Sequence, residues 1–177
     1  MTEHVFWITS RAAGTAALLF SSAAVCVGLA MGGAFVRRRG ADLRVTHEAL
    51  SLATLAALAV HALVLLGDSF MHPSLADVTV PLVSSFQRGW TTMGIVAGWM
   101  LLLLGLSYYA RGRIGVARWR TLHRFTSLAW LLGVVHAVGE GTDAGQPWFY
   151  LPVLVAVVPA AVLLIVRLTG VRAPVPT

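Results

Sequence analysis

The sequence predicts an all-α membrane protein, a bundle of five transmembrane helices in a single domain that covers residues 1–177. Three observations predict this class. Hydrophobic residues make up 58% of the chain and charged residues only 11%, whereas soluble domains carry about 25% charged residues. The mean hydropathy is +0.80. Five apolar segments also approach or exceed the length of about 20 residues that a helix needs to cross a bilayer.

Each apolar segment is expected to form one helix, and the more polar stretches between them are expected to form connections. None of the five alternates in the way that strands of a membrane β-barrel do. The longest connection, residues 67–89, is itself apolar and is expected to fold over the outer end of the bundle. Two GxxxG patterns, at residues 28–32 and 94–98, allow close helix packing or a flat ligand against the backbone. The expected helices span residues 12–36, 45–66, 90–109, 122–138 and 148–166.

Arginine supplies every basic side chain, and its placement predicts the orientation. Eleven of the 13 basic residues fall on one side of a five-helix layout, and only Arg11 and Arg88 fall on the other side. Basic residues favour the cytoplasmic side, so we expect the N-terminus outside and the C-terminus inside. The net charge of +6 is therefore interpreted as a topology signal, and no nucleic-acid partner is expected. The eleven inner arginines are Arg37, Arg38, Arg39, Arg44, Arg111, Arg113, Arg118, Arg120, Arg124, Arg167 and Arg172.

Histidine occurs inside only two of the five segments. His47 and His61 lie in the second, and His123 and His136 lie in the fourth. Ionisable side chains within a bilayer are costly and are functional candidates. The second and fourth helices run in the same direction, and spacings of 14 and 13 residues correspond to about 21 and 19.5 Å. We therefore expect His47 to face His123 near the inner surface, and His61 to face His136 near the outer surface.

The rotation of an ideal α-helix places both histidines on one face in the second expected helix, but not in the fourth. Fourteen residues return to within about 40° of the starting direction, so His47 and His61 share a face. Thirteen residues miss it by about 140°. His123 and His136 therefore share a face only if their helix is locally distorted; otherwise the two pairs approach a ligand from different angles.

Two pairs of imidazoles at different depths are typical of haem iron held by one histidine on each face of the porphyrin. Zinc sites instead use three or four converging donors, and proton relays use carboxylates within the membrane. Because the chain lacks CxxCH, non-covalent haem b is expected. We expect two such haems, an inner one at His47 and His123 and an outer one at His61 and His136. In the alternative, a non-redox transporter or assembly subunit, the histidines only hydrogen-bond helices together.

Two segments resemble the ferric reductase-like transmembrane domain: THEALSLATLAALAVH at residues 46–61 and WRTLHRFTSLAWLLGVVH at residues 119–136. That family includes the membrane parts of ferric reductases and NADPH oxidases, and the haem subunit of the bacterial methionine sulfoxide reductase system. The resemblance covers roughly residues 45–138. It implies two stacked b haems with the same four ligands, and an aromatic side chain between them, for which Trp130 is the candidate. Eukaryotic members have six helices and a fused flavin module, which this chain lacks.

Arginines near the expected haem ligands are candidate partners of the haem propionates, through charge-assisted hydrogen bonds. Arg44, Arg120 and Arg124 flank the inner ligands, although the orientation signal alone also explains them. Arg11 and Arg88 lie on the outer side, where a propionate or a simple interfacial position would account for them.

The sequence thus predicts an electron-transfer subunit in the plasma membrane of a bacterium. Electrons would pass from a cytoplasmic or membrane donor to an external acceptor. No flavin or nicotinamide motif is present, so we expect a separate flavin-binding or reductase protein as partner beside the lipid bilayer. Whether the chain is itself an enzyme stays open. A haem-based sensor is the alternative that keeps both haems.

Overall fold

The computed structural model describes residues 4–32, 40–141, 143 and 145–170. Within these residues the chain is helical and contains no strand, which confirms the all-α class. The helices are α1 (Val5–Gly32), α2 (Gly40–Leu65), α3 (Leu75–Thr79), α4 (Arg88–Leu106), α5 (Arg111–Ile114), α6 (Val116–His123), α7 (Thr126–Glu140) and α8 (Pro147–Thr169).

Among the described residues, four helices are long and apolar enough to cross a membrane, namely α1, α2, α4 and α8. They correspond to the first, second, third and fifth expected segments. The first begins at Val5 instead of residue 12, and residues 33–36 lie outside the described part of the chain, as do Arg37, Arg38, Arg39 and Arg172. A multi-pass membrane protein is thus indicated, whereas the fifth crossing and the orientation of the termini stay predictions.

The fourth expected helix, residues 122–138, is divided between α6 and α7. The backbone N–H groups of Arg124, Phe125 and Ser127 donate to carbonyls three residues earlier, at 3.3, 3.0 and 3.3 Å. The hydroxyls of Thr126 and Ser127 also donate to the carbonyls of His123 and Arg124 at 2.7 and 2.8 Å. Such side-chain bonds compete with the helical ladder, and the chain tightens into a 3₁₀-like turn. The 15 residues of α7 are fewer than a crossing needs.

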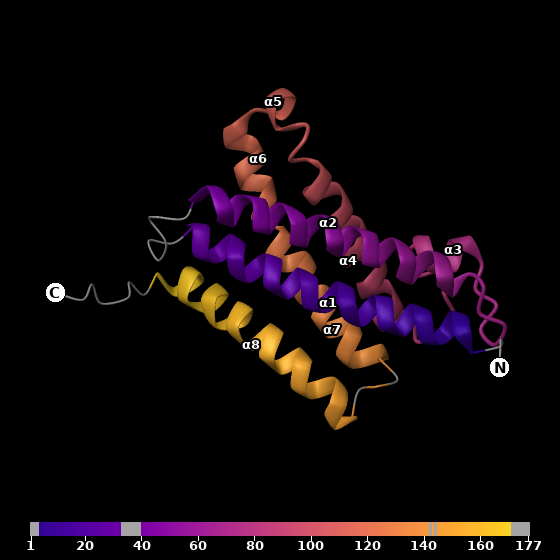
Figure 1. The fold of residues 1–177 in the computed structure, drawn as a ribbon. Coiled ribbons are helices and arrows are strands. Elements are labelled where there is room, and N and C mark those ends of the chain that lie inside the picture. The colour runs from indigo at the N-terminus through magenta and orange to yellow at the C-terminus, as the bar shows by residue number, and fades with distance from the viewer. Residues whose placement is uncertain (1–3, 33–39, 142, 144, 171–177) are drawn as a thin grey trace.

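Helix α1 lies at the centre of the bundle (Figure 1). It packs along α2 on one side and α8 on the other, and α7 crosses it. Helix α4 packs along α7. Successive long helices alternate in direction when α6 and α7 are taken together, so that α2 and α6–α7 run the same way. Helices α5 and α6 project from the bundle beyond the end of α4.

The buried core is small and lies where α1, α7 and α8 meet. Trp130 of α7 is fully buried and packs against Ala160 and Leu164 of α8 and against partly buried apolar side chains of α1. A neighbouring cluster joins α1 to the first turns of α8 and consists of Leu18, Phe149 and Val153. These contacts fix α7 against α1 at mid-depth.

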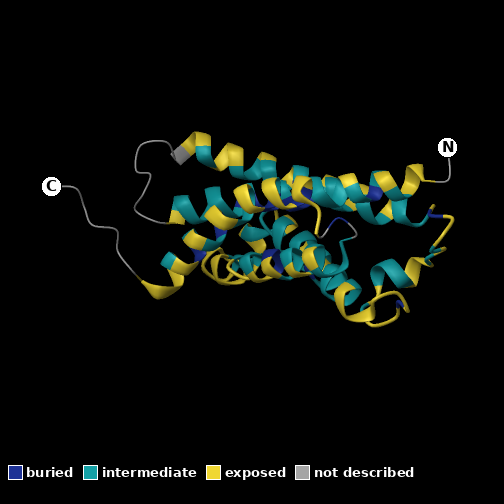
Figure 2. Ribbon diagram, turned by 90° about the horizontal axis from the view of Figure 1, so that it is seen from below, coloured by how far each residue is buried: buried dark blue, intermediate teal, exposed yellow. Residues whose placement is uncertain are grey.

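Many large apolar side chains are exposed on the outside of the bundle, where Figure 2 shows exposed and intermediate residues intermixed along the helices. Helix α8 carries a stripe at helical spacing whose members are 48–70% exposed. A contiguous exposed apolar face on a long helix is expected where the surroundings are lipid. The stripe consists of Leu151, Val155, Val158, Val162 and Ile165.

Candidate functional site

The four membrane histidines form two pairs, as their depths predict. The imidazole centres of His47 and His123 are 6.1 Å apart with an angle of 84° between the ring planes. Those of His61 and His136 are 6.4 Å apart at 69°. Helix α2 supplies one member of each pair, the end of α6 supplies His123, and α7 supplies His136. The predicted juxtaposition is therefore present, and the role of the histidines as metal ligands stays a prediction.

The break between α6 and α7 explains how His123 and His136 both reach α2. An α-helix turns about 100° per residue and a 3₁₀-helix about 120°. Each tightened step between the two histidines thus adds about 20° of rotation, so the three bonds at the break supply about 60° of the 140° mismatch expected of an ideal helix. The local distortion that the spacing requires lies between the two residues that need it.

The separation within each pair suits one ion between two imidazoles. A bound imidazole nitrogen lies about 2.0–2.1 Å from a transition metal, and the ring centre about 1.2 Å behind it. Two rings on opposite sides of one ion therefore have centres about 6.4 Å apart, close to both observed values. No group of three or more His, Cys, Asp or Glu side chains converges among the described residues. A metal at either pair would thus need its further ligands from outside these residues.

Main-chain carbonyls hold three of the four imidazoles by their Nδ1 atoms. His47 Nδ1 lies 2.9 Å from the carbonyl oxygen of Ala24. His61 Nδ1 lies 2.8 Å from that of Ser10, and His136 Nδ1 lies 3.0 Å from that of Trp90. A carbonyl only accepts, so we assign the proton to Nδ1 in all three. Nε2 then keeps its lone pair for a ligand bond, the arrangement usual for metal-binding histidines.

The outer pair has two further polar neighbours. Glu140, one turn after His136, places Oε2 2.9 Å from the same Nδ1, and Thr91 donates to its Oε1 at 2.8 Å. Because the Nδ1 proton points at the Trp90 carbonyl, Oε2 keeps no hydrogen bond among the described residues. Ser10 Oγ lies 3.0 Å from His61 Nδ1. A carboxylate thus lies directly beside the outer pair.

The inner pair has a different, aromatic support. His123 stacks on Trp119 with ring centres 5.0 Å apart, and Tyr108 contacts Trp119 edge-on at 5.8 Å. His123 Nδ1 and Trp119 Nε1 are both buried and have no hydrogen-bond partner within the described ranges. Two unsatisfied buried donors side by side favour an acceptor at this end of the bundle.

A cavity of about 640 Å³ opens at the outer pair, within the size range of pockets for small organic ligands. It lies where the α1–α2 pair diverges from the α4–α7 pair, with His61 and His136 in its wall. The connection of residues 67–89 contributes Met71, Pro73 and Phe86 to the wall of this cavity, and its expected role as a cover over the outer site stays a prediction. The walls are mostly apolar, which suits a largely hydrophobic group.

Trp130 lines the same cavity and is buried at mid-depth. Its Nε1 donates to Ser22 Oγ of α1 at 2.9 Å, and Ser22 Oγ in turn donates to the Leu18 carbonyl at 2.7 Å. The indole is therefore held in one orientation between the depths of the two pairs. Its proposed role between two haems stays a prediction.

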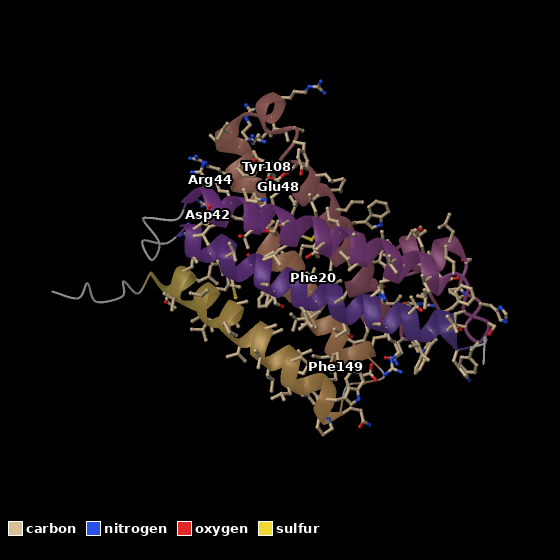
Figure 3. All side chains as sticks on the ribbon, in the orientation of Figure 1. Phe20, Asp42, Arg44, Glu48, Tyr108 and Phe149 are labelled. Carbon is tan, nitrogen blue, oxygen red and sulfur yellow. The ribbon has the colours of Figure 1, made fainter. Side chains whose placement is uncertain are left out.

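The five candidate arginines have different surroundings. Arg11 forms an ion pair with Asp143 and lies over the ring of Trp7, so its charge already has a partner. Arg88 Nε lies 3.4 Å from the Ser84 carbonyl. Arg44, Arg120 and Arg124 are exposed, and Figure 3 shows Arg44 at the N-terminal end of α2. None of these contacts tests propionate binding.

The sequence did not indicate the groups that support the histidines. The carbonyls of Ser10, Ala24 and Trp90 belong to the main chain, which carries no residue-type signal. Glu140 was detectable, because a residue four positions after a histidine shares its helix face. Trp119 lies four positions before His123 and was detectable by the same rule.

Comparison of the chain with protein families, with curated proteins and with solved structures finds no match.

Proposed function

We propose that this chain carries electrons across the plasma membrane of a bacterium, with one b haem at each histidine pair. The observation that carries the proposal is the pair of imidazole-to-imidazole separations, 6.1 and 6.4 Å, at two depths between α2 and the α6–α7 segment. Haem iron held by two imidazoles exchanges single electrons between its ferric and ferrous states. The resemblance of the two histidine segments to the ferric reductase-like domain accords with this function.

The residues present fit a b haem in four respects. Each pair offers two nitrogen donors, and no third donor converges on either pair among the described residues, which leaves the remaining positions of an ion to a macrocycle. Three imidazoles hold Nδ1 against a main-chain carbonyl, which leaves Nε2 unprotonated and able to bind a metal. The cavity beside the outer pair is apolar and of suitable volume. Unpartnered Trp119 Nε1 and His123 Nδ1 are suited to a carboxylate such as a propionate at the inner pair.

The chain's own residues position and insulate the two sites. His47 and His123 hold the inner site, and His61 and His136 hold the outer one. The apolar wall excludes water from the outer pair, and Trp130 occupies the space between the two depths. We place the arginine-rich end of the bundle in the cytoplasm. Because the sequence has no flavin or nicotinamide motif, the donor is a separate protein or a membrane reductant.

Purification from haem-replete cells tests this function. We expect a b-type difference spectrum and a ratio of haem to protein near two. His61→Ala should remove the outer haem alone and His47→Ala the inner haem alone, whereas His72→Asn in the exposed outer connection should keep both. Absence of bound haem in the unaltered protein would overturn the proposal, and loss of both haems in either single variant would contradict separate sites.

A further inference from the structure

Three of the four imidazoles lie directly against a glycine. A Cβ atom built on Gly94 would lie 2.7 Å from Nδ1 and Cε1 of His136. One on Gly14 would lie 3.0 Å from His61 Nδ1, and one on Gly28 would lie 3.1 Å from His47 Cε1. Real Cβ atoms almost never approach as closely as the first, and seldom as closely as the other two. At each of these three positions, a side chain larger than that of glycine would enter the space that the imidazole ring occupies.

Each of these glycines lies one helical turn after the residue whose carbonyl oxygen contacts the imidazole. Ser10 and Gly14, Ala24 and Gly28, and Trp90 and Gly94 are each four residues apart. Helical side chains lean towards the N-terminus, so the side chain at position i+4 covers the carbonyl of residue i. A glycine at that position uncovers the carbonyl. The oxygen can then accept from a histidine of another helix as well as from the helical N–H.

The spacing of the glycines along one helix matches the spacing of the histidines along the helix packed against it. Gly14 and Gly28 are 14 residues apart on α1, as His61 and His47 are on the antiparallel α2. On α4, the residue 14 positions after Trp90 is Leu104, and four further on stands Tyr108 instead of glycine. The Leu104 carbonyl accepts from Ser107 Oγ at 2.6 Å. His123, the histidine at that end, lies within reach of the Leu104 main chain, but its Nδ1 makes no well-formed hydrogen bond and its ring stacks on Trp119.

We propose that Gly14, Gly28 and Gly94 are positioning residues, which open one carbonyl each so that it fixes the tautomer and plane of one histidine. Gly14 and Gly94 serve the outer pair, and Gly28 serves the inner pair. The proposal rests on the proposed function insofar as these histidines bind haem. The proposal also distinguishes Gly28 and Gly94, the first glycines of the two GxxxG patterns, from the second glycines. Close helix packing alone would not predict this difference.

Alanine replacements test the proposal, with Gly105→Ala as the matched control. Gly105 also lies on α4 but not in the wall of the cavity, and a Cβ there makes only an ordinary contact of 3.6 Å with Leu55 Cδ1. We expect Gly94→Ala to lower the ratio of haem to protein from two towards one. The low-spin ferric EPR signal of the outer haem, which reports the angle between the imidazole planes, should vanish or shift. Gly105→Ala should leave both readouts unchanged.

Gly28→Ala supplies the complementary result, since its contact is less severe. Gly28→Ala should shift the EPR signal of the inner haem and leave that of the outer haem unchanged. It therefore tests the proposal even if Gly94→Ala does not fold. Unchanged spectra in both Gly94→Ala and Gly28→Ala, with two haems in the unaltered protein, would overturn the proposal while the proposed function stands.

If the unaltered protein binds no haem, the proposed function fails and the positioning can still be measured. The ¹⁵N resonance of His136 Nδ1 in the detergent-solubilised chain should then shift in Gly94→Ala and stay in place in Gly105→Ala. Equal resonances in the two variants would overturn the role of Gly94.

Discussion

At the scale of single residues, the histidines depend on atoms that belong to other helices. Helix α1 contributes no metal ligand, yet its Ser10 and Ala24 carbonyls orient His61 and His47. Because an imidazole bound at Nδ1 cannot rotate without losing that bond, each ring is fixed before any ligand arrives. This preorganisation lowers the cost of binding a rigid planar group.

The bond from Trp130 to Ser22 gives a stability prediction. Ser22→Ala removes the acceptor and leaves a buried indole N–H unsatisfied, at a cost of about 1–3 kcal/mol. Ser21→Ala is the matched control, because Ser21 Oγ donates only to the carbonyl of Leu18 in its own helix. Thermal unfolding in detergent should show a clearly lower melting temperature for Ser22→Ala and only a small change for Ser21→Ala. Equal effects would contradict the role of this bond.

The carboxylate of Glu140 gives a prediction about reduction potential. A negative charge beside a ligand imidazole raises its basicity and stabilises the ferric state. Glu140→Gln should therefore raise the midpoint potential of the outer haem by tens of millivolts, on the order of 1 kcal/mol for one electron. Glu48→Gln is the control, since Glu48 accepts from Tyr109 at 2.7 Å and contacts neither outer histidine. If a redox titration shows the same shift of the midpoint potential in both variants, the assigned effect of Glu140 is contradicted.

The sequence identified the histidine pairs because burying an ionisable side chain in lipid is costly and its depth can be counted. It did not identify what surrounds them. A carbonyl at Ser10 or Trp90 becomes a partner only when a helix is aligned against α2 or α7, and alignment depends on packing. The glycines at 28 and 94 stood out only as GxxxG patterns, in which their contact with a ring was not visible.

At the scale of elements, the lengths of the apolar runs predicted four helices well and one poorly. Hydropathy averages over the sequence from Leu122 onward and does not register the hydroxyls of Thr126 and Ser127, which bond to nearby carbonyls and divide α6 from α7. The division also supplies part of the rotation that the 13-residue spacing needs. The same turn therefore explains a wrong helix boundary and contributes to the observed histidine pairing.

Helix α3 was not expected, and its N-terminus gives a prediction about pH. Asp77 accepts from the hydroxyl and backbone N–H of Ser74, at 2.6 and 2.8 Å, and these bonds lower the pKa of its carboxyl. A depressed pKa means that the carboxylate stabilises α3 above its ordinary pKa, and that this stabilisation is lost as pH falls through the folded value. The protection of the α3 amides against hydrogen exchange, measured relative to their intrinsic exchange rates, should fall only at acidic pH.

Ser74→Ala provides the comparison for α3. It removes one of the two bonds, so the pKa of Asp77 should move back towards its ordinary range in an NMR titration, and exchange should accelerate at a higher pH. An unchanged carboxyl titration in this variant would show that the capping bonds do not set the pKa.

At the scale of the whole molecule, the few polar residues divide between two ends. Arginines gather around α5, α6 and the start of α2, and the carboxylates of Glu140, Asp143 and Asp77 lie at the end with the cavity. The bundle thus has a basic end near the inner pair and an acidic end near the outer pair. This polarity favours anionic groups at one face and cationic acceptors at the other.

Electron passage between the two faces is the central claim, and sealed vesicles test it most directly. The protein is reconstituted with ferricyanide trapped inside, and dithionite is added outside. We expect the trapped ferricyanide to be reduced rapidly in vesicles that contain the haem-loaded chain. Vesicles with His61→Ala or without protein should show only the slow leak. A rate in the haem-loaded vesicles equal to that of empty vesicles would contradict the account.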